Sequence, residues 1–260
     1  MRVAALYRYP VKGFSREECK ALSVLDSGRI AGDRVLGVRF ANSTVPDDAW
    51  GTKLEFVALA NTPALARLQL EFDHEKLALR IELAGEVLAD EALDDPGRKR
   101  IASAIQEYVL ALDENPLASN PDRLPLRVVG DGVTPRYQDQ AAGYVTLHGR
   151  ASLASLAAAT TPDLSEHRFR SNIVVDDLDA WEEQTWIGRS VQIGEVKFEV
   201  VNAKARCLAT HANPLTGQRD LPIMKTLLEV FPAARPTFAI AMTAARDGTI
   251  HIGDNVIVNG

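Results

Sequence analysis

The chemistry of this sequence centres on one cysteine. Cys207 stands close to two cationic side chains, Lys204 and Arg206. Positive neighbours favour the thiolate over the thiol, and the thiolate is the form that acts as a nucleophile or as a ligand of a soft metal. The residues alone leave a second interpretation open, in which Cys207 is a small and inert side chain. The other cysteine, Cys19, has acidic as well as basic neighbours, which favours the inert interpretation there.

Several familiar active-site motifs are absent from the sequence. It contains no GxGxxG or GxxxxGK phosphate loop, no HExxH, no CxxC and no GxSxG. The five histidines show no zinc-ligand spacing, and nothing selects one of them as a partner for Cys207 in a nucleophile pair. Two cysteines are too few for a four-thiolate iron–sulfur cluster. The motifs therefore argue against the common metal hydrolases and acyl-transfer enzymes.

The distribution of charge indicates a confined anion site. The 260 residues carry 29 basic and 35 acidic side chains, a net charge of −6, which argues against a general nucleic-acid-binding protein. Basic residues nevertheless gather in the stretches 1–20 and 197–220. No run approaches the ~18 apolar residues of a membrane span, and the first residues lack a signal-peptide core. We therefore expect a cytoplasmic protein with no membrane span and no nucleic-acid partner.

Strand patterns outnumber helix patterns along the chain. Alternating or β-rich runs predict strands at residues 2–9, 35–40, 68–72, 77–83, 191–193, 196–202, 237–243 and 250–258. Apolar residues at helical spacing predict helices at residues 95–112, 147–159 and 221–231. Because the helices are not interleaved one per strand, we expect a mostly β (α+β) fold. The segment Asp113–Leu124, with two prolines, is the expected linker between domains at 1–115 and 120–260.

Five short motifs in order resemble one known family. Arg206–Thr210 followed by Asn213–Gly217 resembles the RCxxT…DPxTG signature of the MOSC domain, found in molybdenum cofactor sulfurases, amidoxime-reducing components and bacterial YcbX-type proteins. The other similar stretches are Tyr9–Gly13 (YPVKS in the family), Gly32–Arg34 (GDR), Arg168–Val175 (RFRPNIVV) and Gly253–Val256 (GDxV). This sequence departs from the family pattern at Gly13, Ser171, Ala212 and Asn213.

This resemblance implies a fold and a cofactor site. The implied fold is a MOSC β-barrel with peripheral helices in residues 120–260, and a smaller β-barrel-like domain in residues 1–115. In amidoxime-reducing members, the cysteine that corresponds to Cys207 ligates molybdenum beside a molybdopterin. A soft thiolate suits that ion, and the pterin phosphate needs cations and hydrogen-bond donors. The implied cofactor-binding residues are Lys12, Arg168, Arg170, Asn172, Arg206 and Thr210.

The resemblance also implies an activity, a molybdenum-cofactor oxidoreductase that reduces N-hydroxylated substrates. Its electrons would come from a separate donor protein, because no iron–sulfur cysteine set follows the motifs. No aminotransferase-like domain precedes them, so pyridoxal phosphate is not expected in this chain. A second function stays open, in which Cys207 carries a persulfide and the protein hands over sulfur or cofactor without turnover. A third is a binding protein without catalysis, suggested by Ser171 and Asn213.

Simpler interpretations of single residues also stay open. Arg168 and Arg170 alternate as they would on the solvent face of a strand, and Lys12 could simply follow a turn that Pro10 bounds. His148 and His211 are expected to be structural or peripheral.

Overall fold

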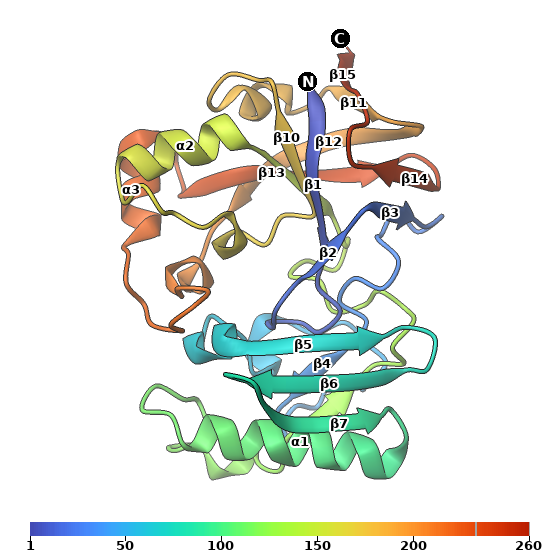
Figure 1. Cartoon of the computed structure of the whole chain (residues 1–260), viewed down its shortest axis with the longest axis vertical. Coiled ribbons are helices and arrows are strands. Elements are labelled where there is room, and N and C mark those ends of the chain that lie inside the picture. Colours follow the sequence, from blue (N-terminus) through green and yellow to red (C-terminus); the bar gives the residue numbers. More distant parts are fainter. Residues whose placement is uncertain (232, 260) are drawn as a thin grey trace.

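Two parts of the chain stack along the long axis of the molecule (Figure 1). The computed structural model describes residues 1–231 and 233–259. The larger part holds both termini and a large mixed sheet, and the smaller part holds strands β5, β6 and β7 beside helix α1 (Figure 1). Residues from both parts meet where the two parts face each other (Figure 1).

An eight-stranded sheet forms the larger part. Its spatial order is β15 (Val256–Asn259), β11 (Ser190–Ile193), β12 (Val196–Ala205), β13 (Thr237–Ala244), β9 (Val145–Gly149), β10 (Ile173–Asp176), β1 (Arg2–Arg8) and β2 (Glu17–Cys19). Only the β9–β10 pairing in this sheet is parallel. A short pair, β14 (Gly248–His251) with β3 (Ala21–Val24), flanks it.

Backbone hydrogen bonds close this sheet into a barrel. Arg2 bridges to Asn255, the Val3 N–H donates to the Asp254 carbonyl over 2.9 Å, and the Val256 N–H donates to the Met1 carbonyl over 3.1 Å. The start of β1 thus meets the start of β15, at the opposite end of the strand order. Closure removes an exposed strand edge, which would otherwise pair with other chains.

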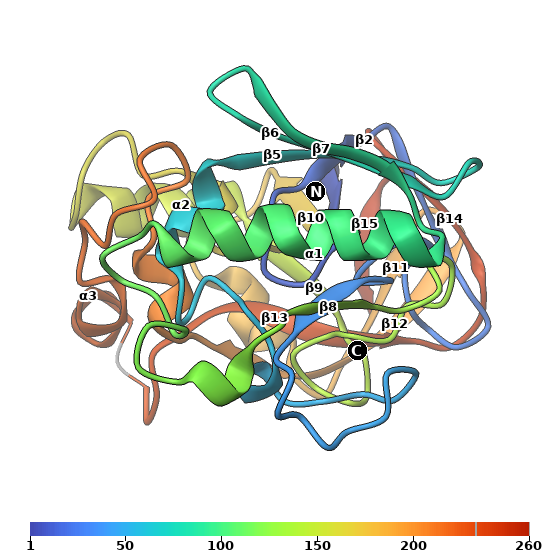
Figure 2. The ribbon, with the colours of Figure 1, turned by 90° about the horizontal axis from the view of Figure 1, so that it is seen from below.

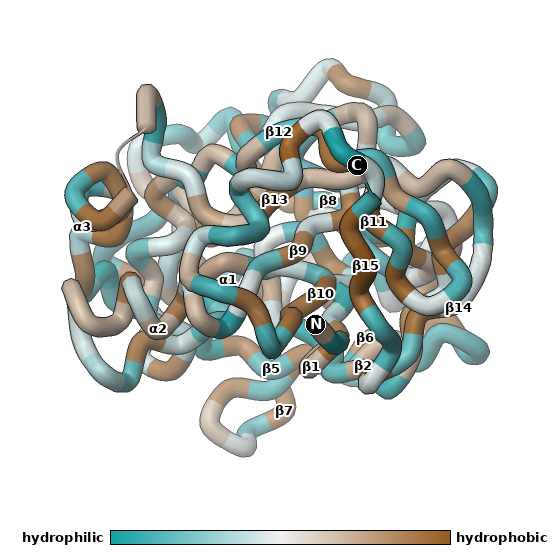
Figure 3. Tube along the Cα trace, turned by 90° about the horizontal axis from the view of Figure 1, so that it is seen from above, coloured by the Kyte–Doolittle hydropathy of each residue, from teal (hydrophilic) through white to brown (hydrophobic). Residues whose placement is uncertain are grey.

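Alternating side chains fill the barrel interior. Val196, Phe198 and Val200 of β12 are buried while the residues between them are exposed, the period-2 pattern of a strand with one face on a core. Burying each such side chain stabilises the fold by about 1.5–3 kcal/mol. Figure 3 shows this interleaving as alternating brown and teal segments along the strands. Helices α2 (Arg150–Ala158) and α3 (Ile223–Val230) pack together at one side of the barrel (Figure 1).

The smaller part combines a three-stranded meander with one helix. The strands β5 (Leu68–Asp73), β6 (Ala78–Leu83) and β7 (Glu86–Ala92) pair in sequence order. Helix α1 (Asp95–Leu110) runs along the meander (Figure 2), and the Asp94 side chain caps its start by accepting from the Gly97 N–H over 2.7 Å. A second pair, β4 (Gly37–Arg39) with β8 (Arg127–Val129), completes this part.

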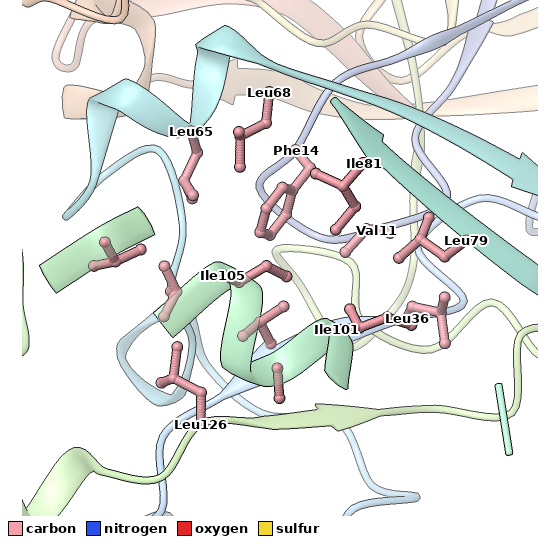
Figure 4. Close-up of a cluster of buried hydrophobic side chains, with 14 of the residues drawn as sticks. Val11, Phe14, Leu36, Leu65, Leu68, Leu79, Ile81, Ile101, Ile105 and Leu126 are labelled. Atoms are coloured by element: carbon pink, nitrogen blue, oxygen red, sulfur yellow. The ribbon is translucent and has the colours of Figure 1, made fainter. Parts of the chain in front are cut away.

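The core of the smaller part lies between α1 and these strands. Ile101 and Ile105 of the helix face Leu79, Ile81 and Leu36 (Figure 4), and all five are at most 1% exposed. The spacing of Ile101 and Ile105, four residues apart, was visible in the sequence as an apolar helical stripe. In the structure this stripe packs helix α1 against the strands of the smaller part.

The expected mostly β fold is confirmed, with two local corrections. Residues 250–258 form two strands instead of one, because a turn with Gly253 in the left-handed region separates β14 from β15. The helix predicted from residue 147 begins at Arg150, because Val145–Gly149 is the buried strand β9. Among the described residues no helix is long and apolar enough to cross a bilayer.

The division into domains 1–115 and 120–260 stays a prediction. The structure shows that β1, β2 and β3, all from the first 24 residues, pair with strands of the larger part. The first 24 residues therefore belong to the sheets of the larger part, while Val11 and Phe14, which follow β1, pack in the core of the smaller part. The segment after β1 thus lies where the two parts meet.

Candidate functional site: a basic cleft beside Cys207

A cleft of about 660 Å³ opens between the end of β12 and the loops of the smaller part. Its volume lies in the usual range of a small-molecule or cofactor site. The smaller part contributes the stretch from Trp50 to Ala60, and β12 with the residues after it contributes Asn202 to Cys207. Both parts of the molecule therefore contribute to the walls of the cleft.

Cys207 lies at the wall of this cleft, directly after β12. It is a free, half-buried cysteine that lines both the cleft and a small adjoining pocket. Its backbone is braced by Thr210, whose hydroxyl donates to the Cys207 carbonyl over 2.9 Å and whose N–H donates to the same carbonyl over 3.0 Å. The thiol is thus held at a fixed place on the wall and stays accessible from the cleft.

Lys12 is buried at the cleft, where an acidic side chain balances it. Its ammonium nitrogen donates to the Tyr137 carbonyl over 2.9 Å and to Asp139 Oδ1 over 3.0 Å. Burial lowers the pKa of Lys12, and the charge of Asp139 opposes that effect. Burial alone would raise the pKa of Asp139, but Lys12, Arg34 and Lys204 together hold that pKa well below its usual range. Asp139 is therefore a carboxylate at neutral pH.

Two arginines that line the cleft, Arg170 and Arg206, each leave a terminal nitrogen without a partner among the residues that the structure describes. Arg206 donates from Nε to the Phe238 carbonyl over 2.7 Å and from Nη1 to the Phe169 carbonyl over 2.9 Å, while its buried Nη2 has no partner. Arg170 donates from Nη1 to the Phe14 carbonyl, and its buried Nη2 also has none. Burial lowers the pKa of each guanidinium to about 10. Both remain cations with a spare N–H, and an anionic ligand would satisfy it.

Basic side chains dominate the lining of the cleft. Among the described residues seven basic side chains line it and Asp139 is the one acidic residue; the basic set is Lys12, Arg34, Lys53, Arg170, Lys204, Arg206 and Arg235. Walls of low dielectric constant strengthen the field of such a cluster, so the cleft attracts anions. The two basic stretches of the sequence, 1–20 and 197–220, both reach it.

Four of these cations were not predicted as site residues. Arg34 belongs to the Gly32–Arg34 motif and Lys204 to a basic stretch, so the sequence did carry a signal for both. Burial lowers the pKa of Lys204 to about 8, and neighbouring cations add to the effect. Lys53 and Arg235 belong to no motif of the sequence, and only the fold brings them to the cleft.

The remaining predicted residues lie beside the cleft. Arg168 and Thr210 line the adjoining pocket with Cys207. The guanidinium of Arg168 is already engaged, by Asp220 Oδ2 at 2.8 Å and the His211 carbonyl at 3.0 Å. Asn172 lines neither space and hydrogen-bonds to Thr146 and to the backbone of β1.

The strand interpretation of the two arginines is wrong. Arg168 ends a short 3-10 turn, Glu166–Arg168, and Arg170 adopts a left-handed backbone with φ of 52°. This turn aims Arg170 at the ring of Tyr9, 4.1 Å from its guanidinium carbon, instead of at solvent. The alternation in the sequence came from a turn and not from a strand face.

The two histidines lie outside the cleft lining. His148 is buried on β9, and burial lowers its pKa to about 3, so it is neutral. His211 accepts the Met224 N–H at Nε2 over 3.3 Å, where helix α3 begins. In the part of the chain that the structure describes, no group of three or more His, Cys, Asp or Glu side chains could hold a metal ion.

Part of this chain is similar in sequence to known proteins. Residues 136–257 match the model of the MOSC domain family. The chain is 34% identical over 118 residues to mitochondrial amidoxime-reducing component 1 of Danio rerio, covering 43% of this chain and 36% of that protein. It is 30% identical over 155 residues to mitochondrial amidoxime reducing component 2 of Homo sapiens, covering 56% and 40%. A match to the molybdenum cofactor sulfurase of Drosophila ananassae is 32% identical over 116 residues, 43% and 15% of the two chains.

These matches cover 40% or less of each relative's length. Among solved structures, the YUAD protein of Bacillus subtilis aligns with 99% of this chain and 94% of its own, at 10% identity and a TM-score of 0.45. Two of the relatives are named as mitochondrial proteins, and the cytoplasmic location expected for this chain stays a prediction.

Proposed function

Because residues 136–257 form a MOSC domain, as the sequence motifs indicated, we propose that this protein binds the molybdenum cofactor in the basic cleft and reduces N-hydroxylated compounds. One observation carries the proposal: Cys207 lies on the wall of a cleft lined by seven basic side chains and one acidic one. The cofactor combines a soft metal with a phosphorylated pterin, so its site needs a thiolate and cations together. Relatives named for amidoxime reduction support the choice of substrate class.

The donors in the cleft fit this cofactor. Arg170 and Arg206 each present a buried Nη2 without a partner, and a phosphate or pterin oxygen would accept from it. Lys12 and Arg34 add charge but already bind Asp139 and Asp33, so they supply field more than free donors. Cys207 would ligate the metal, whose remaining sulfur ligands come with the pterin. When bound, the cofactor supplies two-electron oxygen-atom chemistry at molybdenum.

The side chains of the protein have defined tasks in this reaction. Cys207 would supply the thiolate that ligation requires, from a cleft wall that also carries Lys204 and Arg206. The reduction breaks the N–O bond, takes up two electrons and two protons, and releases water. The electrons come from a separate donor protein. Lys204, with a pKa of about 8, is placed to hold and release a proton in the cleft near neutral pH.

Replacing the thiol by a hydroxyl tests the proposal. Cys207→Ser is expected to lose most bound molybdenum, measured by elemental analysis, and most reduction of benzamidoxime by dithionite-reduced methyl viologen. Pterin fluorescence after denaturation reports whether the organic part still binds. Cys19→Ser is the matched control, because Cys19 lies on β2 and does not line the cleft. Wild-type molybdenum and activity in Cys207→Ser would reject the ligand role.

A sulfur-carrier function is the second candidate. The accessible thiol in a cationic setting suits a persulfide as well, and one relative is named a molybdenum cofactor sulfurase. A mass increase of about 32 Da on Cys207, one added sulfur as in persulfidation, without bound molybdenum or turnover would favour the carrier. Stoichiometric molybdenum with amidoxime reduction would favour the enzyme.

A further inference from the structure

One loop of the smaller part is fixed to the cleft by a buried arginine. Arg39, at the end of β4, is 0% exposed and donates to the carbonyls of Val45, Pro46 and Ala49 over 2.9, 2.6 and 3.0 Å. Its guanidinium carbon lies 4.7 Å from the centre of the Phe56 ring. Three carbonyls on one rigid guanidinium fork hold the loop at residues 45–49 in one conformation.

This fixed loop delivers an aromatic ring to the cleft. Trp50 follows directly, lines the cleft, and is half-buried. Its indole N–H donates to the Gln138 carbonyl over 2.9 Å, one residue before the carboxylate that holds Lys12. The Trp50 ring is held by the loop at residues 45–49 before it and by the hydrogen bond of its indole N–H to Gln138. A ligand that stacks on this ring therefore needs to order little additional structure. Alanines and Leu59 continue the apolar surface nearby.

Two cations at the rim differ from those inside. Lys12, Arg34, Arg170 and Arg206 all contact protein oxygens, as described above. Lys53 and Arg235 also line the cleft, but both are exposed, and neither makes a side-chain hydrogen bond or ion pair with the residues that the structure describes. Lys53 begins a short 3-10 helix, Lys53–Glu55, in the smaller part, and Arg235 lies just before β13 in the larger part. Their charge is available to a ligand that reaches the rim.

We propose that the wall formed by Trp50, Lys53 and Arg235 selects flat N-hydroxylated compounds that also carry a carboxylate. The inner cations and Cys207 are assigned to the cofactor, so this outer wall is the part of the cleft that remains for the substrate. An aromatic ring stacks on Trp50, and the carboxylate lies near the two rim cations. The inference rests on the proposed function for the reaction itself, but the selectivity is a property of this wall.

A matched pair of compounds tests this selectivity. Benzamidoxime and 4-carboxybenzamidoxime share the reacting group and differ in one carboxylate, and acetamidoxime lacks the ring. Each exposed cation is expected to contribute about threefold to binding, within the range of exposed ion pairs. The carboxylate should therefore lower KM by about tenfold against benzamidoxime. The preference should shrink in 0.5 M KCl, because salt screens exposed charges.

Variants separate the contributions of ring and charge. Lys53→Gln and Arg235→Gln should each reduce the carboxylate preference by about threefold. Lys76→Gln is the matched control, because Lys76 is an exposed lysine on the β5–β6 turn. Trp50→Ala should raise KM for both aromatic compounds by about fivefold and leave acetamidoxime unchanged, whereas Trp50→Phe should retain most of the effect.

Binding without electrons keeps the test independent of turnover. Calorimetry of the oxidised holoprotein with each compound, in the absence of a donor, gives the same comparison as a ratio of Kd values. Equal KM and Kd for the two aromatic compounds, or an unchanged preference in both rim variants, would overturn the inference. If no amidoxime is reduced while 4-carboxybenzamidoxime still binds tighter, the proposed function fails and the selectivity of the wall stands.

Discussion

A substitution at Asn172 distinguishes a cofactor-binding role of this residue from a structural one. The family resemblance implies that it binds the cofactor, yet its side chain is 1% exposed and lies at the junction of β9, β10 and β1. Its Oδ1 accepts from the N–H and the hydroxyl of Thr146, both over 3.2 Å, and its Nδ2 donates to the Tyr7 carbonyl over 3.2 Å. We expect Asn172→Ala to lower the free energy of unfolding and to leave cofactor content unchanged.

The size of the loss follows from these three bonds. A neutral hydrogen bond contributes about 0.5–1.5 kcal/mol, and three long ones sum to roughly 2–3 kcal/mol. Leaving the Tyr7 carbonyl without the Nδ2 donor adds desolvation cost at a buried site. We therefore expect the free energy of unfolding to fall by about 3 kcal/mol. Thr146→Val removes two hydrogen bonds, the one that its hydroxyl donates to Asn172 Oδ1 and the one that it accepts from the Asn172 N–H, and should cost about 1–2 kcal/mol.

Urea unfolding of both single variants and of the double variant provides the assay. Because Asn172 and Thr146 share a hydrogen bond, the double-mutant cycle should show a coupling of about 1 kcal/mol. Unchanged slopes against urea would confirm that the same surface is exposed in each variant. The reasoning is refuted if Asn172→Ala unfolds within about 0.5 kcal/mol of the wild type while molybdenum and pterin are lost.

Two further predictions concern charges around the cleft. The pKa of Lys204 is about 8, so its positive charge is present below pH 8 and is lost as the pH rises above that value; binding of pyrophosphate to the cofactor-free protein should weaken from pH 7 to pH 9. Lys204→Met should remove most of this dependence, measured by calorimetry, and an unchanged profile in the variant would contradict the assignment. Arg39→Met should release the loop at residues 45–49, lower the free energy of unfolding by about 3 kcal/mol, and speed chymotrypsin cleavage after Trp50. Lys53→Met is its control, and equal cleavage in both variants would refute the anchoring role.

Much of the framework was visible in the sequence because single elements carry their own periodicity. In β12 apolar residues alternate at Val196, Phe198 and Val200, and in α1 they recur at Ile101 and Ile105. Each pattern indicates an element with one apolar face, and in the structure that face is buried. Cys207 was a candidate in the sequence because cationic neighbours precede it and a turn follows it, and the structure places it on the wall of the cleft.

The errors arose where local pattern and tertiary contact disagree. The predicted helix began at Leu147, but all five residues of Val145–Gly149 are buried between β10 and β13, so a strand forms there. Arg170 occupies a left-handed conformation that a non-glycine residue adopts only when its surroundings hold it, here by contacts with Phe14 and Tyr9. Neither outcome is encoded within a short window. Lys53 and Arg235 show the same limit, because only the packing of two distant segments brings them to one cleft.

The three arginines near Cys207 differ in their hydrogen-bond partners, and this difference distinguishes their roles. Arg168 has a carboxylate partner in Asp220 and also donates to the His211 carbonyl, and these contacts anchor the loop that follows Cys207. Arg170 and Arg206 instead rest on carbonyls alone, and each leaves a buried nitrogen unpaired. A buried cation without a counter-ion costs free energy, and apolar replacements of similar size are often neutral or stabilising. We therefore propose that these two cations are kept beside the accessible thiol for an anion that binds there, because stability alone would favour apolar side chains at both positions.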